Sequence, residues 1–101
     1  MVPRERIREL VIRVILDNQE SSGRPLPQIE LITDDFCPIG DLEGFDSYSA
    51  VETVVELSDL LDCEIDERVF GVRTQDRYAT LKEMVDNLYS IVNPRGAVVN
   101  E

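Results

Sequence analysis

The residues best placed to do chemistry are Asp46 and Ser47, which follow a glycine-bearing turn (residues 40–44) and open an amphipathic helix. A helix N-terminus offers free N–H groups and a partial positive charge, so a serine there can present its hydroxyl for a covalent modification that carries negative charge. The helix dipole contributes only about 0.3–1 kcal/mol, which permits such a site without creating it. A structural alternative stays open, because Asp46 or Ser47 can cap the helix and Ser49 with Glu52 fits a capping box.

Catalysis by the chain alone is not expected. A serine attacks a substrate only beside a base, but the chain has no histidine, and its single lysine, Lys82, is distant in the sequence. Carboxylate pairs such as Asp34 and Asp35 are typical of a solvated surface. Cys37 and Cys63 form no C-x-x-C pair and offer no zinc spacing, so we expect two free thiols, with a disulfide between them as the alternative. We therefore expect a protein that is not an enzyme and holds no metal.

The chain is small and strongly acidic. Its 101 residues fit one domain with a single core, and ten basic against 21 acidic residues give a net charge of −11. This charge disfavours nucleic acids and anionic membranes, and it favours proteins with basic surfaces. The N-terminus does not resemble a signal peptide, and no apolar run approaches the ~20 residues that span a bilayer. We expect a cytoplasmic monomer with protein partners.

Apolar residues at helical spacing predict an all-α fold with three main helices. These run from about Pro3 to Asn18, from Ser47 to Asp62, and from a capping box at Thr80 to Pro94. A short helix at 66–70, a loop at 71–76 and a long first connection complete the small bundle. Apolar residues of that connection, in the segment 28–33 and at Phe36, Ile39, Leu42 and Phe45, are expected to hold it on the core. The domain is predicted to span residues 1–94, followed by a mobile tail at 95–101.

The second predicted helix has two distinct sides. Its aliphatic side, expected to face the core, carries Val51, Val54, Val55 and Leu61. Its acidic side is expected to face solvent and basic partners. The acidic side consists of Glu52, Glu56, Asp59 and Asp62.

The run Gly44-Phe45-Asp46-Ser47-Tyr48, followed by Val51-Glu52 and an acidic helix, resembles the acyl carrier proteins. The hallmark of that family is an Asp-Ser-Leu tripeptide at the start of its second helix. The resemblance extends over residues 39–67 and resumes at 79–88, whose sequence ATLKEMVDNL is similar to the last helix of the family.

This resemblance implies that Ser47, preceded by Asp46, takes a 4′-phosphopantetheine arm from coenzyme A through a separate phosphopantetheinyl transferase. The arm would carry acyl groups as thioesters to acyl-transferring or synthase enzymes with basic docking surfaces, in fatty-acid, lipid or polyketide-type biosynthesis. The residues expected to dock these partners are Tyr48, Glu52, Glu56 and Asp59.

The chain also departs from the family pattern. Tyr48 replaces the usual leucine, and the first loop and the loop before the last helix are longer than usual, which indicates a specialised carrier. The alternative function is an acidic helical protein-interaction module that has the carrier-like fold but no arm.

Overall fold

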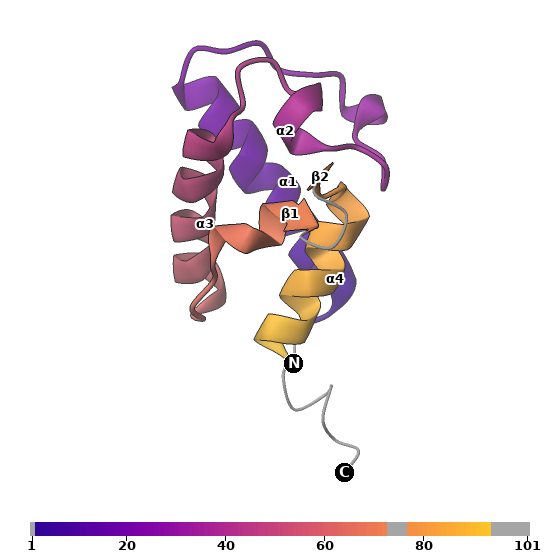
Figure 1. Ribbon diagram of the computed structural model, residues 1–101, viewed down its shortest axis with the longest axis vertical. Coiled ribbons are helices and arrows are strands. Elements are labelled where there is room, and N and C mark those ends of the chain that lie inside the picture. The colour runs from indigo at the N-terminus through magenta and orange to yellow at the C-terminus, as the bar shows by residue number, and fades with distance from the viewer. Residues whose placement is uncertain (1, 73–76, 94–101) are drawn as a thin grey trace.

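The computed structural model describes residues 2–72 and 77–93. Over these residues the chain is a small all-α bundle built on three main helices, α1 (Arg4–Ser21), α3 (Ser47–Leu61) and α4 (Leu81–Val92) (Figure 1). Helix α1 packs against both of the other two. Because α3 and α4 run antiparallel to α1 in Figure 1, the start of α3 lies beside the end of α1. The predicted fold class is confirmed.

Helix α1 buries the apolar stripe that its sequence predicts. Pro3 stands just before the first helical residue, in extended conformation. The helix continues to Ser21, three residues beyond the predicted end at Asn18, and its last turns bury Gln19. The other buried residues of α1 are Ile7, Leu10, Val11, Val14 and Ile15.

The long first connection contains two short helices, η1 (Ile29–Leu31) and α2 (Pro38–Asp41). The expectation that its apolar residues reach the core is confirmed for Phe36, Leu42 and Phe45, which are buried. In the segment 28–33 only Ile32 is buried, whereas the other apolar residues of that segment stay exposed. Backbone bonds from Leu81 N to Phe36 O (2.7 Å) and from Lys82 N to Asp34 O (3.1 Å) also tie the connection to the start of α4.

The inward side of α3 differs from the aliphatic side that the sequence indicates. The expectation that Val51 and Val55 face the core is wrong, because they are 43% and 59% exposed. The valines are equally apolar, so their pattern does not fix which of them faces the neighbouring elements. Packing against α1 and the segment after α3 selects a different set. The buried residues of α3 are Ser49, Ala50, Thr53, Val54 and Leu57.

The segment after α3 forms the short helix η2 (Glu67–Phe70), which buries Val69 and Phe70 as expected. The next residues, β1 (Gly71–Val72), pair in antiparallel register with β2 (Arg77–Tyr78). The expectation of a simple loop at 71–76 is therefore wrong at Gly71 and Val72, which form a strand. A strand of two residues is too short to show in the sequence the alternation of apolar and polar residues by which strands are recognised. Residues 73–76 lie outside the described part.

The capping box that opens α4 is confirmed. The Thr80 hydroxyl accepts a bond from Glu83 N (3.3 Å), and Glu83 Oε1 accepts one from Thr80 N (2.9 Å). At the other end of α4, the side chain of Asn93 exchanges two bonds of 2.9 Å with the backbone of Val2, so the start of the chain lies beside the end of α4. The predicted terminator Pro94 and the tail at 95–101 lie outside the described residues.

The capping box predicts a pH dependence of stability. An ion pair with Arg77 (2.6 Å) and the bond from Thr80 N lower the pKa of Glu83 from 4.5 to about 2. A carboxyl with a lowered folded-state pKa stabilises the fold above its unfolded pKa and stops doing so as pH falls through the folded value. We expect Glu83→Gln to lower the melting temperature above pH 4.5, and the difference from the wild type to shrink towards pH 2.

Melting followed by circular dichroism at several pH values measures this difference. Subtracting the variant from the wild type removes the contributions of all other carboxyl groups, and glutamine retains the shape of the capping box. A difference that stays constant between pH 4.5 and 2 would contradict the assigned role of the charge.

Candidate functional site

Asp46 is the residue that caps α3. Its Oδ1 atom accepts hydrogen bonds from the backbone N–H groups of Ser49 and Tyr48, both at 3.1 Å. These bonds lower the pKa of Asp46, because they stabilise the carboxylate form. Ser47 is the first helical residue and is exposed, and its hydroxyl makes no hydrogen bond within the described part of the chain. Of the capping alternatives left open by the sequence, the structure selects Asp46 and leaves Ser47 unengaged.

Ser49, the rival hydroxyl, is buried and engaged. Its Oγ atom accepts a bond from Arg24 Nη2 (3.0 Å) and lies 3.4 Å from Asp46 Oδ1. The alternative capping box is also absent from α3, because Glu52 instead accepts a bond from Asn18 Nδ2 (2.9 Å) on α1. Of the two serines, only Ser47 presents a hydroxyl to solvent.

The turn that precedes Ser47 is held by a polar cluster that the sequence analysis missed. Arg24 donates to Gln19 Oε1 (3.1 Å), to Asn18 Oδ1 (2.8 Å) and to the carbonyl of Gly44 (2.9 Å). Gln19 in turn donates to the carbonyl of Glu43 (2.7 Å). The sequence does hold a sign of this cluster, because the helical spacing of the buried apolar residues of α1 continues to positions 18 and 19, where the residues are polar. This cluster fixes the start of α3 against the end of α1.

Gly44 is required at its place in that turn. Its φ is +78°, in the left-handed region that favours glycine, and an added Cβ would lie 2.5 Å from Arg24 Cδ. The glycine therefore permits both the turn and the close approach of the arginine that stabilises it.

The residues expected to dock partners lie on the solvent side of α3. Tyr48 is 77% exposed, and Glu52, Glu56 and Asp59 are exposed as well. Val51 and Val55 belong to this surface rather than to the core. Because residues three or four apart are neighbours on a helix, the exposed apolar and acidic residues alternate along one side. We call this side the α3 docking surface; it consists of Tyr48, Val51, Glu52, Val55, Glu56 and Asp59.

A pocket of about 390 Å³ adjoins Ser47. Residues from the first turn of α3, from α2, from η2 and from the β1–β2 pair form its walls, so segments distant in the sequence meet beside the serine. Its lining is mostly apolar, with charged groups on one segment. The lining residues are Ile39, Ser47, Ala50, Glu67, Arg68, Phe70, Gly71 and Tyr78.

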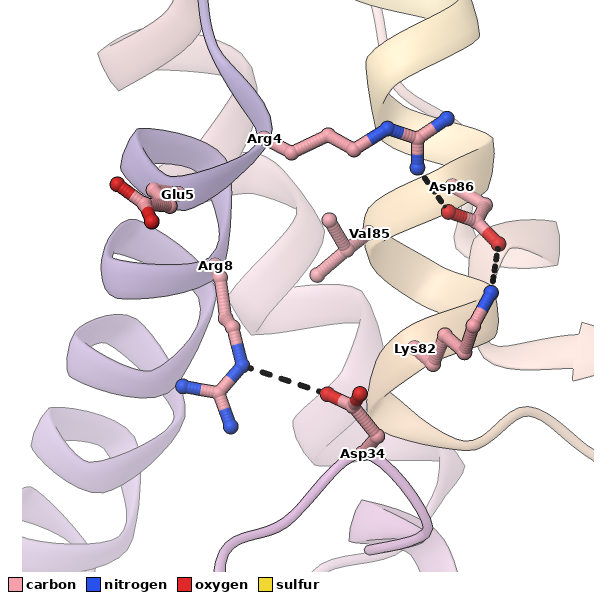
Figure 2. A pocket seen from close by; sticks show the side chains of 7 residues that line it. All are labelled: Arg4, Glu5, Arg8, Asp34, Lys82, Val85 and Asp86. Carbon is pink, nitrogen blue, oxygen red and sulfur yellow. Dashed lines mark hydrogen bonds and ion pairs between the residues drawn. The ribbon is translucent and has the colours of Figure 1, made fainter.

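A smaller pocket of about 200 Å³ lies between α1 and α4, around Val85 (Figure 2). Lys82 and Arg4 both contact Asp86, and their hydrogen bonds lower its pKa although partial burial raises it. Figure 2 also shows Arg8 of α1 directed at Asp34 of the first connection, at 3.6 Å.

Each cation of this smaller pocket therefore lies against a carboxylate. These contacts tie α1 and the first connection to α4, which indicates a structural role. Exposed ion pairs of this kind are worth about 0–1 kcal/mol each.

The described residues show further features relevant to function. Cys37 and Cys63 are free, as expected, and burial together with the nearby charge of Asp41 raises the pKa of Cys37.

Within residues 2–72 and 77–93, no group of three or more possible ligands could hold a metal ion. None of the helices in the same ranges is long and apolar enough to cross a membrane.

Comparison with known proteins gives no further assignment. No protein-family model matches the chain, and no curated protein or solved structure matches it either.

Proposed function

We propose that the chain is a cytoplasmic acyl carrier protein whose Ser47 holds a 4′-phosphopantetheine arm. The observation that carries the proposal is the exposed, unengaged hydroxyl of Ser47 at the first position of α3, directly after the capping Asp46. The residues present fit such a group, because a phosphodiester on Ser47 would lie at the positive end of the helix dipole. The terminal thiol of the arm, when bound, holds acyl groups as thioesters.

The chain itself contributes binding and orientation in this function. Its α3 docking surface combines exposed apolar side chains with carboxylates around the serine. Charges at the rim of an interface mainly set the encounter rate and the choice of partner, which suits a protein that must bind and release several enzymes. The proposed partners are a phosphopantetheinyl transferase and the acyl-transferring or synthase enzymes of fatty-acid, lipid or polyketide-type biosynthesis. Basic surfaces on these enzymes would complement the acidic helix.

The experiment that tests the proposal is an intact-mass measurement. The purified chain is incubated with coenzyme A, Mg²⁺ and a promiscuous phosphopantetheinyl transferase. We expect the mass to rise by one 4′-phosphopantetheine arm. An unchanged mass with several different transferases would contradict the proposal.

A second candidate is an acidic interaction module without an arm. It is favoured by the exposure of Tyr48, Val51 and Val55, since a docking surface of this kind does not itself require a prosthetic group. The two candidates differ in their response to substitution. In the second, Ser47→Ala leaves function intact, and reversing the charges of Glu52 and Glu56 abolishes it.

The docking surface predicts a charge dependence of arm attachment. Glu56 and Asp59 are exposed, and neither forms an ion pair within the described residues. We expect the double variant Glu56→Lys/Asp59→Lys to load about tenfold more slowly at low salt, because it loses electrostatic attraction to a basic transferase. The initial rate of the mass change measures this.

The control is Glu5→Lys/Glu9→Lys, which changes two exposed carboxylates on α1 and so alters the net charge by the same amount. The deficit of the double variant should shrink at high salt, because exposed charges are screened there. Equal slowing of the control and the double variant would show that net charge, rather than the α3 docking surface, sets the rate.

A further inference from the structure

Arg24 is the residue on which the interactions around the start of α3 converge. It follows the end of α1, which lies beside the start of α3 (Figure 1). We propose that Arg24 is a positioning residue for arm attachment, which acts through Ser49 to hold the cap of α3 and so fixes the Ser47 hydroxyl for transfer. The inference rests on the proposed function and adds to it a residue, outside the α3 docking surface, that sets the rate of modification.

The guanidinium of Arg24 is held by bonds to neutral acceptors. It donates to Gln19 Oε1 (3.1 Å), to Asn18 Oδ1 (2.8 Å) and to the carbonyl of Gly44 (2.9 Å). A further bond runs from its Nη2 atom to Ser49 Oγ (3.0 Å). Among the residues that the structure describes, Arg24 forms no ion pair. Its role is therefore geometric, because the planar fork of an arginine donates in several fixed directions at once.

The buried amide of Gln19 fixes the position of the arginine. Gln19 Nε2 donates to the carbonyls of Pro25 (3.0 Å) and Glu43 (2.7 Å), which are the neighbours of Arg24 and Gly44 in the sequence. The backbone N–H of Arg24 also donates to Gln19 O (3.0 Å). A satisfied network of buried polar groups is rigid. The guanidinium therefore has one orientation relative to the turn before α3.

Ser49 connects the arginine to the cap of α3. Its Oγ atom accepts the bond from Arg24, so its single hydroxyl proton is left to donate to Asp46 Oδ1, 3.4 Å away. The same Oδ1 atom accepts bonds from the N–H groups of Tyr48 and Ser49, both at 3.1 Å. Ser47 stands between the capping carboxylate and these N–H groups. Loss of Arg24 frees the Ser49 hydroxyl to rotate and loosens the cap around Ser47.

The position of the Ser47 hydroxyl matters because attachment of the arm is a displacement at phosphorus. Ser47 Oγ forms a bond to the phosphorus of coenzyme A that bears pantetheine. The bond from that phosphorus to the bridging oxygen breaks, adenosine bisphosphate leaves with the electron pair, and a base of the transferase takes the hydroxyl proton. Misplacement of a reacting group by about 1 Å costs about 100-fold in rate. A loosened cap should therefore lower kcat, whereas the unchanged α3 docking surface should preserve KM for the chain.

The kinetics of arm attachment test the proposal. At a temperature well below the melting temperature of every variant, we expect Arg24→Met to lower kcat about tenfold and to leave KM for the chain within about twofold. Arg24→Lys retains the charge but loses the fork, so it should be slowed nearly as much. The control is Arg13→Met, which removes an exposed charge of α1 that forms no ion pair in the described part of the chain. This variant should load like the wild type.

Two further readouts separate positioning from a contribution to folding. Ser49→Ala interrupts the link but retains Arg24, and it should lower kcat about threefold. The double variant Arg24→Met/Ser49→Ala should be no slower than Arg24→Met, because residues that act through one another are not additive. Amide hydrogen exchange at Tyr48 and Ser49 should accelerate in Arg24→Met, whereas a purely global loss of stability would accelerate the core amide of Leu88 instead.

The outcomes separate this inference from the proposed function. Absence of loading in the wild-type chain would contradict the carrier function and this inference with it. Loading of Arg24→Met at the wild-type rate, full recovery in Arg24→Lys, a rise in KM alone, or additive slowing in the double variant would each overturn the positioning role while leaving the carrier function in place.

Discussion

The Ser47→Ala chain should gain no mass when it is incubated with coenzyme A, Mg²⁺ and a phosphopantetheinyl transferase. The loss should be complete rather than partial, because the substitution removes the oxygen to which the arm would be attached. Ser49 cannot replace it, since its hydroxyl is buried and bonded to Arg24 and Asp46. Intact mass spectrometry of the reaction measures the result.

The matched control is Ser90→Ala, which removes the hydroxyl of an exposed serine on α4. This variant should load like the wild type. Ser47 is exposed and makes no hydrogen bond within the described residues, so both variants should keep the melting temperature of the wild type. Attachment to the Ser47→Ala chain would show that another residue carries the arm.

Leu57→Ala should destabilise the fold by about 2–5 kcal/mol. Leu57 has no exposed surface and lies on the inward side of α3, so truncation removes buried methyl groups and leaves a cavity. This loss is a large share of the total stability of a small domain, which is typically about 5–15 kcal/mol. Urea unfolding followed by circular dichroism measures the change in free energy of unfolding.

Leu60→Ala on the same helix is the control. Leu60 is 51% exposed, and its truncation should change the free energy of unfolding by no more than about 0.5 kcal/mol. The comparison tests which side of α3 faces the core. Similar losses in the two variants would mean that the helix is rotated from the position described here.

Regular features of the bundle could be predicted from local sequence. The main helices follow from apolar spacing, and the start of α4 follows from the Thr80–Glu83 capping box, because a cap involves residues only three apart. The position of Asp46 and Ser47 at the start of α3 was predictable for the same reason. In each case the interactions that decide the structure lie within one or two turns of helix.

Features that depend on distant residues could not be predicted in this way. Whether Val51 or Val54 faces inward depends on where the neighbouring elements pack, which the valines themselves do not encode. The contacts of Arg24 with the turn and with Ser49 of α3 join residues 20 and 25 positions apart. Tyr78 reaches the pocket beside Ser47 only through the β1–β2 pair. The position of the candidate serine at the start of α3 could therefore be predicted from sequence, whereas the pocket beside it and the support of its turn required the fold.

The measurement that tests the central claim most directly is fragmentation mass spectrometry of the chain recovered from the cells that make it. This measurement requires no choice of transferase or acyl donor. The account predicts a population that carries one 4′-phosphopantetheine arm, with every fragment that retains the added mass containing Ser47. A chain that is unmodified throughout growth, or an arm on any other residue, would contradict it.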